Sequence, residues 1–313
     1  MATEAHDFDS IAASSRFAFA LKDGELWACG ANERGQLGID SAAESLKSFT
    51  RVNFEKRIRQ VACGWEHTVL LTEDDSVYVA GGGSKGQLGL GEEKTTCQAF
   101  SYVEIGERVK QVCCGVWFTL ALGESGKIFG WGSNRDCCLS QDPLCSVFWS
   151  PICLDFVSES KIVKVAAGHR HVVALQEDKS VHSWGSNRFQ QVITHSGPVS
   201  DVFAGWHHSI IQISETELKI FGKNDHNQLA HVDPLAHENT IRVTDPIRSI
   251  ATGSDHTLIL LQSGQLLSFG WNEHGILGDG TNETRHGKIC TVPFDKEIKN
   301  IFCGYGSCFL LTH

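Results

Sequence analysis

Residues 61–91 read VACGWEHTVLLTEDDSVYVAGGGSKGQLGLG, and this stretch decides the fold because related copies of it recur along the chain. Each copy has two apolar runs separated by a turn, which contains a Gly in all copies but the degenerate N-terminal one, and in most copies a His follows that Gly three residues later. An acidic or Gly-containing turn, a short aromatic run and an Asn/Gly turn come next. Short apolar runs bounded by turn residues predict β-strands.

The copies begin near residues 11, 61, 112, 165, 202, 250 and 301, and the chain end cuts the last one short. A period on the order of 50 residues is typical of a propeller blade, and no window has sustained helical spacing. We therefore predict an all-β, seven-bladed propeller made of six full repeats and a half repeat. It forms a single domain over residues 11–313, after an N-terminal tail of residues 1–10.

These repeats resemble the regulator of chromosome condensation family of β-propellers over nearly the whole chain. Within the family, QVACGWEHTVLL, FGWGSN and the terminal SFGWNEHGILGDGT and FCGYGSCFLL look like the secretion-regulating guanine nucleotide exchange factor. They look equally like the fungal killer-toxin-insensitivity propeller. Family members usually begin with a strand pair that completes the last blade, and residues 1–10 offer none. Truncation of the sequence is our first explanation; unusual closure or strands from a partner are the alternatives.

Composition argues against several classes of function. The formal net charge of −10 and pI near 5.8 disfavour binding to nucleic acid and to anionic membranes, which needs a basic face. We see no signal peptide and no apolar run long enough to span a membrane, so we expect a cytoplasmic or nuclear location. The twelve Cys are then expected to be thiols. Spacings such as Cys303-x4-Cys308 contain no CxxC pair, which predicts no structural metal.

A Gly-rich motif, Gly81-x-Gly83-x-x-Gly86, matches a dinucleotide fingerprint on paper. That fingerprint functions only where a helix N-terminus follows the loop, and no helix is predicted here. The same place reads GANERG, GSNRDC and GWNEHG in other copies, which indicates a tight turn. No catalytic arrangement of side chains stands out either. We predict no cofactor and no enzymatic activity beyond a possible role as an exchange factor.

Residues that recur in the copies are interpreted as structural. A catalytic His occurs once per site, whereas a residue repeated around a ring is part of the architecture, and its buried nitrogens need hydrogen-bond partners. Phe118 and Ser307 replace this His in two copies. The residues assigned to this structural class are His67, His171, His208 and His256, with Gly64, Gly115, Gly168, Gly205, Gly253 and Gly304 in the turns before that position.

Residues that vary at the turn tips are the candidates for binding. In a meander, the turns after the first and third strands lie at the same end of the sheet, and aromatic and Arg side chains favour binding hot spots. The alternative is that the Trp rings point inward and plug the central channel. By contrast, Trp27, Trp131 and Trp184 are expected in the core. The predicted partner-binding rim comprises Trp65, Glu66, Trp117, His169, Arg170, Trp206, His207, Asp255 and Tyr305.

Two functions remain open from the sequence. The resemblance to the killer-toxin-insensitivity propeller implies a non-enzymatic adaptor for the small zinc-ribbon protein of diphthamide synthesis and Elongator regulation, in tRNA wobble-uridine and translation-factor modification. The other resemblance implies guanine nucleotide exchange on a small GTPase, with residues 39–57 and 140–160 as candidates for an inserted wedge. Chromatin binding and Trp-based photoreception, known in other family members, are minor alternatives.

Overall fold

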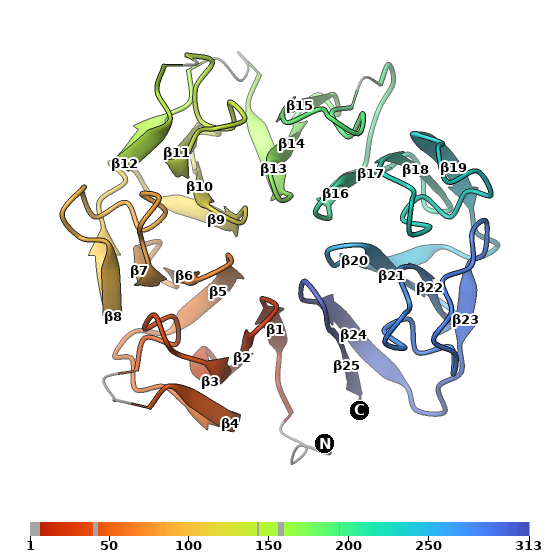
Figure 1. Cartoon of the computed structure of the whole chain (residues 1–313), viewed down its shortest axis with the longest axis horizontal. Helices are drawn as coiled ribbons and strands as arrows, with labels where there is room; N and C mark the ends of the chain where they lie inside the picture. Colours follow the sequence, from red (N-terminus) through yellow and green to blue (C-terminus); the bar gives the residue numbers. More distant parts are fainter. Residues whose placement is uncertain (1–6, 40–42, 143, 156–159, 194, 313) are drawn as a thin grey trace. The chain divides into compact units, whose positions relative to one another are not determined.

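The computed structural model describes residues 7–39, 43–142, 144–155, 160–193 and 195–312, and every regular element in those ranges is a β-strand (Figure 1). No helix in those ranges has the length and apolar character required to cross a membrane. The strands form seven sheets, and neighbouring strands within each sheet follow one another in the chain. The chain divides into two compact units, residues 1–162 and 163–313, which are described separately.

The first unit contains three four-stranded sheets. Their strands are β1 (Ser10–Ala13), β2 (Phe17–Lys22), β3 (Glu25–Ala31) and β4 (Ser45–Arg51); β5 (Ile58–Cys63), β6 (His67–Thr72), β7 (Val77–Gly82) and β8 (Thr96–Val103); and β9 (Val109–Cys114), β10 (Phe118–Gly123), β11 (Ile128–Ser133) and β12 (Val147–Cys153). The first strands β1, β5 and β9 contact one another in turn, while β4, β8 and β12 lie at the opposite edges of their sheets (Figure 1).

The second unit continues the pattern with four sheets. Their strands are β13 (Ile162–Ala167), β14 (His171–Gln176) and β15 (Val181–Gly185); β16 (Asp201–Ala204), β17 (His208–Gln212), β18 (Glu217–Gly222) and β19 (Glu238–Arg242); β20 (Ile247–Thr252), β21 (His256–Leu261), β22 (Leu266–Gly270) and β23 (Cys290–Val292); and β24 (Ile298–Cys303) and β25 (Cys308–Thr312). The boundary between the units falls inside β13. The last sheet therefore has two strands in the described residues, which confirms the predicted half repeat.

The hydrophobic core lies between neighbouring sheets within each unit. Val79 and Trp131, from adjacent sheets, belong to one buried cluster of the first unit, and Ile220 and Phe269 belong to one in the second. The second strands β6, β10, β14 and β21 are buried at every position. Full burial of a large apolar side chain stabilises the fold by roughly 1.5–3 kcal/mol. Sheet-to-sheet packing therefore explains the continuous apolar runs in the sequence.

The turn that joins the first two strands is held by one repeated backbone bond. The N–H of Gly64 donates to the carbonyl of His67 at 2.9 Å, and the equivalent Gly115, Gly168, Gly205, Gly253 and Gly304 bond to the third residue after them in the same way. This bond closes the hairpin at the end of the sheet where the variable turn tips lie. The recurring Gly positions thus set the geometry of the candidate binding surface.

The predictions for the tryptophans are met in part. Trp131 is completely buried and donates its indole N–H to the carbonyl of Gln87, and Trp184 is also buried. Trp27 is only half-buried, so the prediction that it belongs to the core is wrong. Trp131 directly precedes Gly132 near the end of β11 and Trp184 directly precedes Gly185 at the end of β15, whereas Trp27 lies earlier in β3, opposite Ala20.

Candidate functional site

The recurring histidines occupy the first position of the second strand and are fully buried. The Nε2 atom of His67 lies 3.0 Å from the hydroxyl of Thr119 on the next sheet. His171 has the same relationship to Ser209 at 2.9 Å, and His208 to Thr257 at 3.3 Å. These bonds tie neighbouring sheets together within each unit, which supports the structural interpretation of these residues.

Burial fixes the protonation state of these rings. It lowers the pKa of His67 and His171 to about 3 and that of His208 to about 4, because the charged form loses its hydration. The rings are therefore neutral near pH 7. Each neutral imidazole can therefore hydrogen-bond to the hydroxyl of the next sheet and join the two sheets.

The Gly-rich motif also has a structural explanation. In the equivalent turns, an Asn side chain accepts the N–H of the residue five positions later: Asn32 from Leu37 at 3.0 Å and Asn224 from Leu229 at 3.0 Å. In the motif itself, the side chain of Gln87 accepts the N–H of Lys85 at 2.8 Å. These backbone donors are used within the turns, and no helix follows them in the described residues. The turns therefore lack the helix N-terminus that a phosphate-binding loop needs.

The two kinds of turn lie at the same end of each sheet, as the meander pattern predicts. The backbone N–H at the end of the third strand donates to the tip of the first turn: Gly82 to Glu66 at 2.7 Å, Ser133 to Trp117 at 2.8 Å and Lys223 to His207 at 3.0 Å. Ser186 and Trp271 bond in the same way to Arg170 and Asp255. Each sheet thus presents its two variable tips together.

Turn tips of successive sheets are also linked to one another. In the first unit, the N–H of Trp65 donates to the carbonyl of Val116 at 3.3 Å. In the second unit, His169 donates to Trp206 at 3.2 Å, Trp206 to Ser254 at 3.0 Å, and Ser254 to Tyr305 at 3.1 Å. This series of backbone bonds holds the tips in fixed positions. Side chains on them are therefore pre-organised for contact with a partner.

The second unit carries a continuous row of rings on these tips, here called the aromatic turn cluster. The rings contact in the order Phe189, His207, His169, Trp206 and Tyr305, with centroids between 5.2 and 5.4 Å apart. The four predicted members of this cluster, His169, Trp206, His207 and Tyr305, are half-buried. Phe189 also belongs to the cluster, although it is not among the predicted rim residues.

A hollow of about 230 Å³ opens beside the aromatic turn cluster. It is lined by His169, Arg170, Ser186, Arg188, Phe189, Gln191 and His207. Both arginines are exposed, and the Arg188 guanidinium lies 5.4 Å from the centre of the Phe189 ring. Burial lowers the pKa of His169 to about 4 and also lowers the pKa of His207. The positive charge at the hollow therefore comes from the arginines and not from the imidazoles.

The remaining predicted rim residues lie in more polar surroundings in each unit. Trp65, Glu66 and Trp117 are half-buried in the first unit, and Glu66 lies 3.9 Å from the Arg34 guanidinium. In the second unit, Asp255 is half-buried and accepts a 2.9 Å hydrogen bond from Gln228. The structure thus shows where each rim residue lies, and their role in binding stays a prediction.

The two candidate wedge segments, residues 39–57 and 140–160, each contain a strand that belongs to a sheet. Residues 45–51 form strand β4 and residues 147–153 form strand β12, each the last strand of its sheet. Residues 40–42, 143 and 156–159 of these segments lie outside the described residues. The strands are half-exposed edge strands and not loops that project from the sheet. This finding argues against either strand as an inserted wedge.

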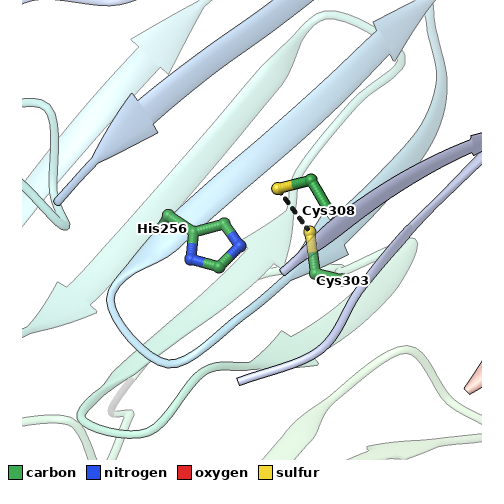
Figure 2. A group of neighbouring side chains, drawn as sticks. All are labelled: His256, Cys303 and Cys308. Carbon is green, nitrogen blue, oxygen red and sulfur yellow. Dashed lines mark hydrogen bonds between the residues drawn. The ribbon is translucent and has the colours of Figure 1, made fainter. Parts of the chain in front are cut away.

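A buried cluster that the sequence did not predict lies at the end of the chain. His256 on β21 faces Cys303 on β24 and Cys308 on β25, with their ligand atoms within 4.8 Å of one another (Figure 2). Burial raises the pKa of the Cys303 thiol, and its hydrogen bond to Cys308 lowers the pKa of the Cys308 thiol to about 5. The spacing of Cys303 and Cys308 is visible in the sequence, but His256 belongs to the preceding sheet, so local spacing does not connect it with them.

Known structures identify the class of fold. Human WBSCR16 superimposes with a TM-score of 0.86 at 20% identity, covering 99% of this chain and 88% of that one. Prp20p from Saccharomyces cerevisiae superimposes with a TM-score of 0.82 at 21% identity, covering 97% and 81%. The chain therefore has the all-β propeller fold of these two proteins, with six full repeats and a partial seventh.

The family follows from the repeats themselves. A model of the regulator of chromosome condensation (RCC1) repeat matches residues 23–71, 74–122, 125–175 and 263–311. A second model of the repeat matches residues 58–87, 109–136, 162–191 and 247–276. The chain belongs to the regulator of chromosome condensation (RCC1) repeat family.

Curated relatives include proteins of several functions. The secretion-regulating guanine nucleotide exchange factor of Bos taurus is 30% identical over 237 residues, which cover 68% of this chain and 51% of the relative. The ultraviolet-B receptor UVR8 of Arabidopsis thaliana is 30% identical over 224 residues, covering 66% and 50%. The chain thus spans about half the length of the curated relatives it matches.

Proposed function

We propose that this chain is a non-enzymatic protein-interaction propeller that binds a small GTPase through the aromatic turn cluster and acts in guanine nucleotide exchange. The observation that carries the proposal is the row of rings from Phe189 to Tyr305 beside the hollow with Arg170 and Arg188. Large, rigid aromatic side chains and arginines dominate binding energy at protein interfaces. The turn tips that carry them are fixed by backbone bonds, which lowers the entropic cost of binding.

The charge at the hollow indicates the chemistry of the partner. The protein is acidic overall, with a formal net charge of −10, yet two exposed arginines stand beside the rings. An acidic or phosphate-bearing surface with an adjacent apolar group would complement this site. The names of relatives support the partner class, since one is a guanine nucleotide exchange factor and another, from Homo sapiens, is a GTPase regulator.

The adaptor role in tRNA and translation-factor modification, with the zinc-ribbon protein as partner, stays a prediction that the relatives described above do not support. It uses the same surface and differs only in the partner. The two functions are therefore separated by a binding experiment with purified proteins. A cytoplasmic or nuclear location suits either function.

The test measures binding and GDP release with a panel of purified small GTPases and with the zinc-ribbon protein. We expect one GTPase to bind and to release fluorescent GDP faster in the presence of the wild-type chain. Arg170→Glu and Trp206→Ala should weaken binding at least about tenfold, as expected for hot-spot residues. Tyr102→Ala, which removes an exposed ring on β8, is the matched control and should bind like the wild type.

The outcomes separate the alternatives. Equal binding by Arg170→Glu, Trp206→Ala and wild type, with all three folded by circular dichroism, would rule out the aromatic turn cluster as the binding surface. Binding of the zinc-ribbon protein alone would replace the exchange function by the adaptor function. Binding of a GTPase without faster GDP release would restrict the role to that of an effector or scaffold.

A further inference from the structure

Three soft donor atoms meet between the last two sheets of the second unit. His256 begins β21, Cys303 ends β24 and Cys308 begins β25, and the two cysteines are register partners across the hairpin. Their Sγ atoms lie 3.9 Å apart, and a ring nitrogen of His256 points toward them (Figure 2). All three ligand atoms lie within 4.8 Å of one another.

The His256 imidazole differs from its counterparts in other repeats. It is completely buried, and among the described residues neither ring nitrogen has a hydrogen-bond partner other than the nearby Cys308 thiol. In His67, His171 and His208 the Nε2 atom is satisfied by a hydroxyl on the next sheet. Cys308 stands where those repeats have the hydroxyl. A thiol is a weak hydrogen-bond partner, and a buried polar ring that is poorly satisfied costs free energy. A cation held by the ring and both thiols would satisfy it.

The geometry of the donors fits a tetrahedral metal ion. Zinc binds thiolate sulfur at about 2.3 Å, so two sulfurs at the tetrahedral angle lie roughly 3.8 Å apart. The observed separation of 3.9 Å matches this value. The donor set of two thiols and one imidazole has no carboxylate, which selects soft or borderline cations and excludes Mg²⁺ and Ca²⁺.

We propose that His256, Cys303 and Cys308 bind one thiophilic transition-metal cation, with Zn²⁺ as the ion expected. Each thiol gives up its proton on binding, and a water or an external donor completes the fourth position. The ion joins the two-stranded sheet β24–β25 to β21 of the preceding sheet. A two-stranded sheet is only marginally stable alone, so the metal stabilises the end of the fold.

The experiment uses the full chain, stripped of metal by a chelator and kept reduced with a phosphine. Zn²⁺ is titrated in competition with a chromophoric chelator, and Co²⁺ is added separately to give a visible spectrum. We expect one tight equivalent of Zn²⁺. Co²⁺ should produce thiolate charge-transfer bands and the intense visible bands of tetrahedral coordination. Bound Zn²⁺ should also raise the Tm, because it binds only the folded state.

Two substitutions keep the fold while they remove ligands. Cys308→Thr introduces the hydroxyl that Thr119 and Thr257 supply elsewhere, so it should fold and hydrogen-bond His256, but lose the tight equivalent and the Co²⁺ spectrum. Cys303→Ala should lose both as well. Cys114→Ala, at the equivalent place before the turn Gly of another sheet, is the matched control and should retain both.

Contrary results are equally clear. A reduced wild-type chain without a tight equivalent, or a Cys308→Thr variant that keeps the Co²⁺ spectrum, would overturn the proposal. Loss of two thiols on air oxidation, with no metal bound by the reduced chain, would show that the pair is a disulfide site instead.

Discussion

The imidazole of His67 lies against the α-carbon of Gly64, so closely that a methyl group there would come 2.0 Å from the Cε1 atom of the ring. Gly205 and His208 repeat this relationship at 2.1 Å, and Phe118 takes the place of the imidazole over Gly115 at 2.1 Å. The turn Gly and the ring three residues later therefore pack directly against each other. The ring bonds to the next sheet only because the Gly leaves room for it.

A first prediction concerns this fit. Gly205→Ala forces the methyl group into the His208 ring, and overpacking of this kind typically costs about 1–3 kcal/mol. We expect a lower free energy of unfolding in urea by that amount. Gly306→Ala is the matched control, because no atom of the described residues lies within 4 Å of a Cβ added there.

A double-mutant cycle identifies the cause. In a His208→Ala background the ring is absent, so Gly205→Ala should lose most of its cost. An additive result for the two substitutions would show that the ring does not determine the requirement for Gly.

The second prediction concerns acid sensitivity. The pKa of His67, His171 and His208 is lowered to between about 3 and 4 by burial, below the usual 6.5. At a pH between the lowered pKa and 6.5, these histidines are protonated in the unfolded chain but not in the folded chain. The free energy of unfolding therefore falls as pH decreases from about 6.5. Each ring contributes a slope of up to roughly 1.4 kcal/mol per pH unit.

Substitution of one ring tests this linkage. His67→Phe places at β6 the ring that Phe118 provides at β10, and Thr119 keeps its bond to the carbonyl of Gln87. Urea unfolding at several pH values should show a slope smaller by up to one proton between pH 4 and 6.5. An unchanged slope would mean that His67 does not contribute to the acid sensitivity.

The repeats could be read from the sequence because they depend on local signals. Alternating apolar runs and turn residues predicted the seven sheets, the half repeat and the burial of the recurring histidines. Trp27 was misjudged because its position relative to the strand-ending Gly differs from that of Trp131. Gly132 follows Trp131 directly, whereas Gly30 comes three positions after Trp27, so the two side chains have different registers in their strands.

The candidate site required contacts that no single repeat contains. The aromatic turn cluster joins Phe189 and His207 from different sheets, and the donors around His256 come from two sheets. The variable tips could be selected from the sequence, but their ring-to-ring order could not. Side-chain direction on a turn is set by the neighbouring sheet, which a pattern within one repeat does not describe.

A third prediction concerns the Asn of the second turn type. The buried Asn224 accepts the N–H of Leu229 and donates its amide to the carbonyls of His231 at 3.0 Å and Asp233 at 2.6 Å. Asn224→Asp replaces these donors with an acceptor that faces two carbonyls. We expect a loss of about 1–3 kcal/mol in urea unfolding at pH 7.

The repeat itself supplies the control for that substitution. Asn187 occupies the same place in another sheet and accepts the N–H of Val192, but it is exposed. Asn187→Asp should therefore cost well under about 1 kcal/mol, since water satisfies the altered group. Equal costs at the two positions would contradict the role given to the buried amide.

The last prediction concerns an acid that joins two sheets of the first unit. The carboxylate of Asp75, only 5% exposed, lies 2.6 Å from Arg59 and 2.5 Å from Arg108. Burial opposes its ionisation, but hydrogen bonds from the two arginines outweigh burial and lower the pKa of Asp75. Asp75→Asn keeps a residue that tolerates the positive φ of 64° and removes the charge.

We expect Asp75→Asn to lower the free energy of unfolding by about 1–3 kcal/mol at pH 7. Asp74→Asn is the control and should lower it by less than about 1 kcal/mol, because the ion pair of Asp74 with Lys56 is exposed. Because a lowered acid pKa stabilises the fold above the unfolded value of about 3.9, the difference between wild type and Asp75→Asn should narrow as pH falls through 4. A difference that stays constant across this range in urea unfolding would show that the charge of Asp75 does not stabilise the contact.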